Sequence, residues 1–140
     1  MTNSKQNKVS FLTTVFSNNS QYLNNFFESL KTQTFIDFDV IVVNDGYEEF
    51  EDIKKKYEQS LNIIEIKYLN TPAKNRERGV NFCIDSKYET VIFGDSDDYF
   101  ANNRVEKSIE LLKNNDIVVN DLNLFDDKGV YEEKYMSHRL

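Results

Sequence analysis

The chain has 140 residues, of which 39% are hydrophobic, and a formal net charge of −7 at pH 7. This length suits one domain with a substantial core. The negative charge argues against a general nucleic-acid-binding protein, which needs a basic face, and against electrostatic docking on anionic lipid. The single cysteine, Cys83, excludes an intrachain disulfide and a cysteine metal cluster, which fits a reducing cytoplasm. No apolar run approaches the roughly 18 residues of a membrane helix, so we expect no transmembrane segment.

The first part of the chain alternates strand and helix patterns. Residues 1–7 are polar, and we expect a disordered lead-in without the apolar core of a signal peptide. Residues 9–16 are β-branched and aromatic, which predicts a strand. Cap-forming residues at 17–20 then precede apolar side chains at three- and four-residue spacing, which predicts a helix to about Thr32. Residues 40–43 are an unbroken apolar run, typical of a strand buried on both faces in a parallel sheet.

The alternation continues through the second part of the chain. Amphipathic patterns predict three further helices, at 48–60, 74–86 and 103–113. Further strands are predicted at 63–69, 89–93 and 116–119, and then a hairpin with arms at 121–125 and 130–133. In the helix over 74–86 we expect Val80, Cys83 and Ile84 to face inward. Asn103 and Glu106 have the spacing of a capping box.

Strands that alternate with helices imply an α/β fold with a parallel sheet and right-handed crossovers. In such sheets ligands bind beyond the carboxyl ends of the strands. Three predicted strands end in polar residues, which are Thr13-Thr14, Asn44-Asp45-Gly46 and the acidic stretch 95–98. Because these ends meet at one edge of the sheet, the sequence predicts a site there.

Residues 91–98 (VIFGDSDD) run from an apolar strand into three carboxylates within four positions. Crowded carboxylates near a core repel one another and lose hydration unless a cation neutralises them or solvent reaches them. Two interpretations follow from the residues alone. One is a site for Mg2+ or Mn2+, which prefer oxygen ligands and often share them with phosphates. The other is an acidic surface turn that caps the next helix.

Several stretches in order resemble the nucleotide-binding half of family 2 glycosyltransferases, which are inverting enzymes with the GT-A fold. The matching stretches are 8–12, 22–35, 38–46, Arg76 with Gly79-Val80, and 91–98. The resemblance covers residues 8–121, and it implies a three-layer α/β/α domain with a mostly parallel central sheet that binds a nucleotide sugar. The hairpin and tail at 122–140 would then begin an incomplete acceptor-binding part.

The resemblance implies a role for each matching residue. Asp45 would accept the ring N–H of the donor base, usually uracil, and Thr14 would line the base pocket. Arg76 would lie near the diphosphate, with Arg78 as a substitute. In the Asp-x-Asp motif, Asp95 would lie near the ribose and Asp97 would bind the divalent metal, Mn2+ or Mg2+. Asp95 and Asp98 are further candidate metal ligands.

The chain departs from the family pattern at several positions. The family often has Pro-Thr-Tyr-Asn after the first strand, where this chain has Thr13-Thr14-Val15-Phe16-Ser17, so Phe16 is the candidate for stacking on the base. Arg-Asn before the glycine of the third helix is replaced around Arg76-Glu77-Arg78. These changes affect the expected identity of the donor more than the expected fold.

An inverting transferase also needs a general base for the acceptor hydroxyl, and we identify none in the sequence. Among the acids beyond the motif, Asp121, Asp126 and Asp127 fit a strand end and a turn, and His138 lies in the polar tail. The chain is therefore expected to be part of a larger enzyme, a separate donor-binding domain, or one of two chains that complete an acceptor site together.

We predict a metal-dependent glycosyltransferase, or its donor-binding part, that uses a nucleoside-diphosphate sugar, with a UDP sugar expected. The acceptor would be a glycan or a lipid-linked molecule, and the chain would be cytoplasmic, with a peripheral position at the inner face of the membrane left open. The alternatives are a catalytically silent nucleotide-sugar-binding module and a doubly wound interaction domain without a ligand. A Rossmann dehydrogenase is disfavoured because no G-x-G-x-x-G follows the first strand.

Overall fold

The structure is a computed structural model, and it describes residues 8–135 apart from the side chain of Asn19. The lead-in predicted at 1–7 and the only histidine, His138, lie outside the described residues. The chain divides into two compact units between Ile109 and Glu110. Each unit is described by itself below.

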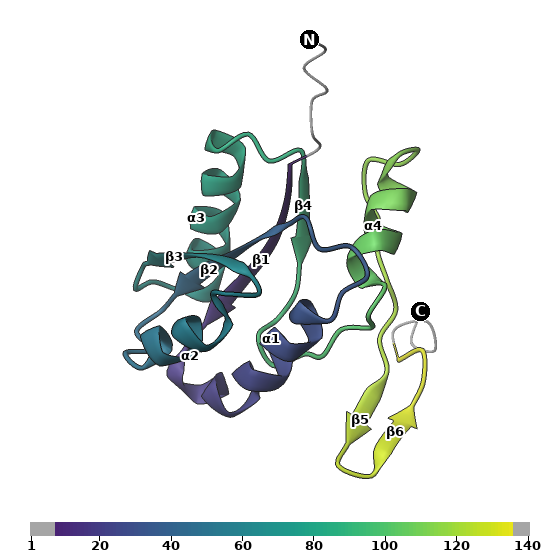
Figure 1. Ribbon diagram of the computed structural model, residues 1–140, viewed down its shortest axis with the longest axis horizontal. Helices are drawn as coiled ribbons and strands as arrows, with labels where there is room; N and C mark the ends of the chain where they lie inside the picture. Colours follow the sequence, from purple (N-terminus) through teal and green to yellow (C-terminus); the bar gives the residue numbers. More distant parts are fainter. Residues whose placement is uncertain (1–7, 136–140) are drawn as a thin grey trace. The chain divides into compact units, whose positions relative to one another are not determined.

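A four-stranded sheet forms the centre of the first unit (Figure 1). Its strands, in chain order, are β1 (Val9–Val15), β2 (Asp39–Asn44), β3 (Asn62–Lys67) and β4 (Thr90–Phe93). They lie in the order β3-β2-β1-β4, and every pairing is parallel. This order confirms the α/β fold with a parallel central sheet that the alternating patterns predict.

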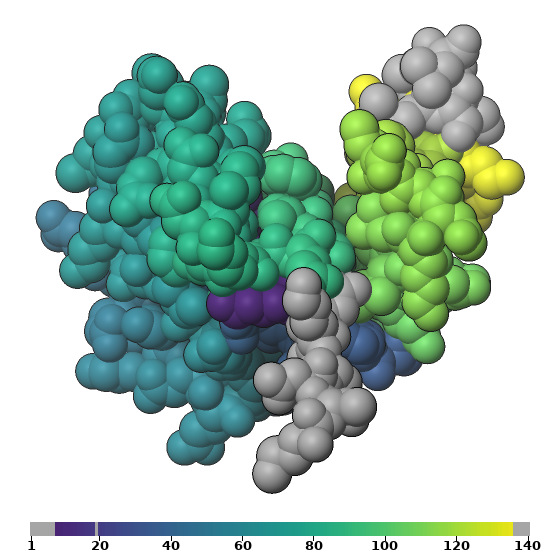
Figure 2. Space-filling model, turned by 90° about the horizontal axis from the view of Figure 1, so that it is seen from above, coloured from purple at the N-terminus to yellow at the C-terminus, as the bar shows by residue number. Residues whose placement is uncertain are grey.

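Helices cover both faces of this sheet, which confirms the three-layer α/β/α architecture (Figure 1). On one face, α1 (Leu23–Lys31), α2 (Phe50–Tyr57) and the start of α4 (Arg104–Leu112) pack on the larger core. On the other face, α3 (Pro72–Asp85) packs on a smaller core. The strand β1 is buried between the two layers, and in the view from above it shows as a small purple area (Figure 2).

The helix α3 lies unusually close to the sheet at Gly79. A Cβ atom added there would lie 2.5 Å from Leu12 Cδ1 and 3.1 Å from Val43 Cγ2, so this contact requires glycine. The buried residues of α3 are Asn75, Gly79 and Cys83, which follow one another at a spacing of four. The prediction that Ile84 faces inward is wrong, because Ile84 lies one position beyond this stripe and is 61% exposed.

The helices α1 and α3 begin at other residues than predicted, and for α3 local capping gives the reason. The chain after β1 first forms a 3-10 helix, η1 (Ser17–Tyr22), before α1 begins. The helix α3 begins two residues earlier than predicted, since Pro72 fits the first turn and Thr71 Oγ1 accepts a hydrogen bond from Lys74 N at 3.3 Å.

The second unit contains the predicted hairpin, formed by β5 (Leu124–Asp126) and β6 (Gly129–Glu132) in antiparallel pairing. The strand predicted at 116–119 is wrong. That segment is irregular, with Ile117 80% and Val119 88% exposed. A β-branched run has strand propensity, but it forms a strand only where a neighbouring strand supplies hydrogen bonds, and this segment pairs with none of the described strands.

Candidate functional site

The carboxyl edge of the sheet brings the three predicted polar strand ends together. In the β1–β2 ladder, Thr14 lies opposite Val43, and Asp45 N donates to Val15 O at 2.8 Å just beyond the last pair. On the other side of β1, Gly94 N donates to Leu12 O at 3.2 Å, so the chain is still held to β1 when it enters the acidic stretch. Asp45, Thr14 and Asp95 therefore follow the ends of three neighbouring strands.

The turn after β2 is fixed by the side chain of Asn44. Its Nδ2 donates to Tyr47 O at 2.9 Å and to Glu65 Oε2 at 2.7 Å, and its Oδ1 accepts from Tyr47 N at 2.9 Å. Gly46 completes the turn with a φ of +81°, a conformation that suits glycine. Asp45 is half-buried in this fixed turn, and its carboxylate has no hydrogen bond or ion pair within residues 8–135.

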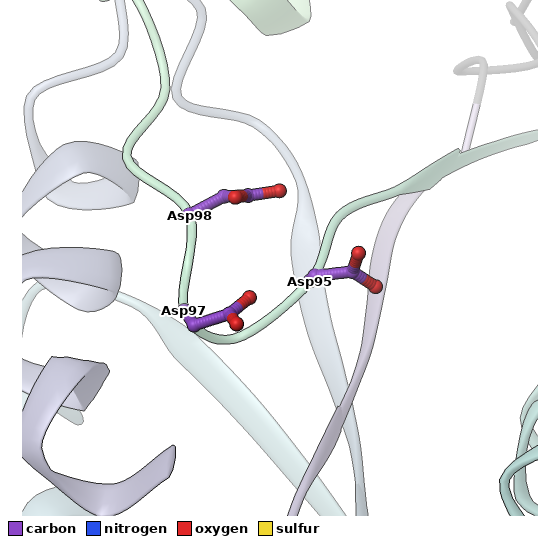
Figure 3. A group of neighbouring side chains, drawn as sticks. All are labelled: Asp95, Asp97 and Asp98. Atoms are coloured by element: carbon purple, nitrogen blue, oxygen red, sulfur yellow. The ribbon is translucent and has the colours of Figure 1, made fainter. Parts of the chain in front are cut away.

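The acidic loop, residues 95–98, carries three exposed carboxylates that project from the chain as it leaves β4 (Figure 3). One oxygen each from Asp95, Asp97 and Asp98 can be chosen so that all three lie within 4.8 Å of one another. Three hard oxygen donors at this separation fit the ligand preference of Mg2+ or Mn2+. The donor set therefore suits the predicted cation.

Partial burial and then repulsion inside the acidic loop both raise the pKa of Asp98. Partial burial of its carboxyl group, followed by the negative charges of Asp97 and Asp95, raises the pKa of Asp98 to about 6, while Arg104 opposes the shift. Burial lowers the pKa of Arg104 from its ordinary value, and Asp98 opposes that change. Sequence reasoning did not single out Arg104, which approaches the loop from the start of α4.

The acidic loop is anchored from both ends. A Cβ atom on Gly94 would lie 2.5 Å from Phe100 Cζ and 2.6 Å from Phe11 Cε1, so the strand end and the ring that follows the loop are in close contact. Within the loop, Asp98 N donates to Asp95 O at 3.1 Å. These contacts hold the carboxylates near one another although the carboxylates repel each other.

The buried side chain of Gln33, which comes much earlier in the chain, holds the segment that follows the acidic loop. Gln33 Nε2 donates to Ala101 O at 2.8 Å, and Gln33 Oε1 accepts from Val105 N at 3.0 Å, so this side chain caps α4. The predicted capping box does not form, because the Glu106 carboxylate accepts from Thr34 Oγ1 at 2.8 Å instead. Gln33 lies in a stretch that matches the family, but nothing in its local sequence shows that its partners are about 70 residues away.

The remaining predicted residues lie around these two segments. Arg76 Nη2 is 3.7 Å from Asp95 Oδ1, and both side chains are more than half exposed, so this ion pair is weak and easily exchanged for another anion. Thr14 is half-buried at the end of β1, and Phe16, just beyond it, is 36% exposed. The functional roles of these residues stay predictions.

Three buried polar side-chain atoms have no hydrogen-bond partner within the described part of the chain, and they are Thr13 Oγ1, Asn75 Oδ1 and Ser96 Oγ. Thr13 is near the end of β1, Asn75 is in the first turns of α3, and Ser96 is within the acidic loop. Unpaired buried polar atoms are rare in folded proteins and indicate a missing ligand or water. Here all three lie toward the carboxyl ends of the strands.

Comparison with known proteins agrees with this arrangement. The profile of the family described as "Glycosyl transferase family 2" matches residues 10–139, which is nearly the whole chain. The chain belongs to glycosyl transferase family 2. No curated protein matches this family 2 chain at a significant level.

Similar solved structures come from Staphylococcus aureus TarS. One structure of TarS has a TM-score of 0.62 and 25% identity, over 76% of this chain and 19% of that one. TarS 1–349 in complex with UDP-GlcNAc has a TM-score of 0.63 and 26% identity, with 76% and 31% covered. TarS 1–349 in complex with UDP has a TM-score of 0.61 and 26% identity, with 76% and 32% covered. This family 2 chain therefore spans less than a third of each of these proteins.

Two further observations concern the described residues of this family 2 chain. Within residues 8–135, no helix has the length and apolar character needed to cross a membrane. In the hairpin, Asp126 Oδ1 accepts from Lys128 N at 2.8 Å, which agrees with the interpretation of Asp126 as a turn residue. A general base stays unassigned.

Proposed function

We propose that this chain is the donor-binding part of a glycosyltransferase and that it binds a nucleoside-diphosphate sugar, specifically a UDP sugar. The main support is the convergence of three polar strand ends at one sheet edge in a chain of glycosyl transferase family 2. The similarity to TarS structures that contain UDP-GlcNAc and UDP favours uracil as the base.

The two ends of the nucleotide would be recognised by different chemistry. At the base end, the half-buried Asp45 carboxylate accepts the uracil N3–H, with Thr14 beside it and Phe16 as a stacking surface. At the phosphate end, Arg76 exchanges its weak contact with Asp95 for the diphosphate, because a guanidinium pairs well with phosphate oxygens.

Asp97, with Asp95 and Asp98, would hold the divalent cation, Mn2+ or Mg2+. A bound cation stabilises the negative charge that develops on the leaving nucleoside diphosphate. The loop anchors at Gly94 and Gln33 keep the three carboxylates in place before the ligand arrives, so little reorganisation is needed.

In the complete enzyme the acceptor oxygen would attack the anomeric carbon as the bond from that carbon to the diphosphate breaks. The configuration inverts, and the acceptor hydroxyl gives its proton to a general base. That base, and the site for a glycan or lipid-linked acceptor, would come from a further domain or a partner chain. The short coverage of TarS favours, as a second candidate, a module that binds the donor without turnover.

Calorimetric titration of the 140-residue chain with UDP tests the proposal. We expect binding in Mn2+ or Mg2+ that weakens at least about tenfold in EDTA, which corresponds to about 1.4 kcal/mol. ADP serves as the control nucleotide, because adenine lacks the ring N–H that Asp45 would accept. Binding of UDP that is equal with and without metal would contradict the cation role, and no binding of UDP would contradict the whole proposal. Hydrolysis or transfer of the sugar from UDP-GlcNAc would separate an active enzyme from a silent module.

A further inference from the structure

Asn75 in α3 is a buried polar side chain with one end of its amide hydrogen-bonded and the other end unpaired. It is 2% exposed, and its Nδ2 donates to Asn70 O at 3.3 Å. This bond fixes the amide orientation, since the NH2 group faces a carbonyl oxygen. The opposite atom, Oδ1, is buried and has no donor in the described part of the chain.

The position of Asn75 follows from the close contact one turn further along α3. Gly79 lies against Leu12 of β1 and Val43 of β2. Because β3 and β4 are parallel, the helix between them runs back from the carboxyl edge of the sheet (Figure 1). Four residues of helix rise about 6 Å and two residues of strand rise about 6.6 Å. Asn75, four residues before Gly79, therefore lies over the residues two beyond Leu12 and Val43.

Those two residues are Thr14 and Asp45, the pair assigned to the base pocket. Thr14 points toward the α3 face, because Leu12 belongs to the core on that face and strand side chains alternate. Asp45 lies just beyond β2, where its N–H still bonds to Val15 O of β1. Two acceptors, Asp45 and Asn75 Oδ1, thus lie near the same carboxyl edge of the sheet, and neither has a hydrogen-bond partner among residues 8–135. A buried acceptor without a donor destabilises the folded protein, and this cost is recovered when a donor arrives.

We propose that Asn75 is a specificity-determining residue of the nucleotide site, and that its Oδ1 accepts a hydrogen bond from an N–H or O–H group of the bound nucleoside. This inference rests on the proposed function and adds a residue to it. A site with buried acceptors rejects ligands that lack the matching donor, because the acceptors then stay unpaired. Asn75 would therefore select the nucleoside, whereas the acidic loop holds the phosphates.

The test is the affinity for UDP in Mn2+ of the variants Asn75→Ala and Asn75→Leu, the latter close in shape but without an acceptor. We expect affinity about 5- to 10-fold weaker for both, as for loss of one hydrogen bond. Asn81→Ala, an exposed asparagine on the same helix, is the matched control and should bind UDP like the unmodified chain.

The melting temperature without ligand separates a binding role from a structural one. Each variant removes an unpaired buried acceptor, which favours the folded state, and also the donor to Asn70 O, which opposes it. We therefore expect a melting temperature within a few degrees of that of the unmodified chain. Unchanged UDP affinity in either folded variant would overturn the role of Asn75 alone. Absence of UDP binding in the unmodified chain would overturn this role together with the proposed function.

A titration with 2′,3′-dideoxy-UDP assigns the donor atom. If the loss caused by Asn75→Ala persists with this ligand, the partner is the only base N–H, N3–H, which Asp45 and Asn75 would then share as a three-centre hydrogen bond. If the loss disappears, a ribose hydroxyl is the partner. Both results support a hydrogen-bond donor on the nucleoside. Because Asn75 is not a proposed metal ligand, the loss of UDP affinity in Asn75→Ala should be the same in Mn2+ and in EDTA.

Discussion

The acidic loop and the base side of the same sheet edge are both costly to the ligand-free protein, but for different reasons. The loop holds three exposed like charges close together, and repulsion contributes to the raised pKa of Asp98. The base side, formed by Thr14, Asp45 and Asn75, includes the half-buried Asp45 carboxylate and the buried Asn75 Oδ1, and neither acceptor has a donor within residues 8–135. One region is short of positive charge, and the other is short of hydrogen-bond donors.

The two costs are relieved by different parts of a ligand. Repulsion between exposed charges is relieved by any cation of suitable size and is weakened by salt. An unpaired buried acceptor is satisfied only by a donor that fits the pocket, largely independently of salt. In the proposed function, the acidic loop would therefore supply affinity for a metal diphosphate, and the base side would select the nucleoside.

Asp97→Ala should give the largest change, because it removes a charged ligand from the proposed metal centre. We expect the affinity for UDP in Mn2+ to fall at least about 100-fold, or about 2.8 kcal/mol, with a metal-free melting temperature equal to or slightly above that of the unmodified chain, because one repelling charge is removed. Calorimetry in Mn2+ and in EDTA measures the effect, and the two values should become equal in the variant. Asp37→Ala, at an exposed aspartate outside the loop, is the control. Retained metal dependence in Asp97→Ala would show that another group holds the cation.

Asp45→Asn should have a smaller effect of a different kind. The amide keeps the size of the side chain but loses the charge that strengthens the bond to a base N–H, so we expect roughly a tenfold loss of UDP affinity. The loss should be the same in Mn2+ and in EDTA, in contrast to Asp97→Ala. Should Asp45→Asn instead reduce metal dependence, the separation between the two regions would be wrong.

The sheet and its polar edge could be predicted from the sequence because their signals are local. An unbroken apolar run such as 40–43 shows burial on both faces, and the order of strands and helices then determines where the strand ends meet. Asp45, Thr14 and the acidic loop follow directly from this reasoning, and the structure places them on neighbouring strands.

The supports of the site depend on distant partners and could not be predicted in this way. In the sequence, Gln33 is only a polar residue after a helix. Its hydrogen bonds to Ala101 and Val105 form because the fold brings these distant residues next to it. Asn75 resembles any polar residue in a first helical turn, and its importance follows from the close contact at Gly79, which only the packed structure shows. The segment 116–119 is the opposite case, since its local pattern is strand-like but the partner strand is missing among the described residues.

Asp98→Asn should give the smallest effect, a change in stability that is measured without metal, so that the proposed role of Asp98 as a cation ligand does not enter. The pKa of Asp98 is about 6 in the folded chain, above its ordinary value of 3.8, because of partial burial and the charges of Asp97 and Asp95. Between these two values the folded state binds more protons than the unfolded state, so the free energy of unfolding falls as the pH rises through this window. Above pH 6 the full penalty remains.

Residue 98 does not titrate in the Asp98→Asn variant. Without metal, we therefore expect the melting temperature of this variant to be higher than that of the unmodified chain at pH 7 and equal to it near pH 4. Solvent screening at this exposed position limits the gain to about 1 kcal/mol or less, or a few degrees in melting temperature. Asp37→Asn, outside the loop, should show no such pH-dependent difference. A lower melting temperature of Asp98→Asn at pH 7 would mean that Asp98 stabilises the loop through its charge. In that case repulsion would not be the property that distinguishes the acidic loop from the base side.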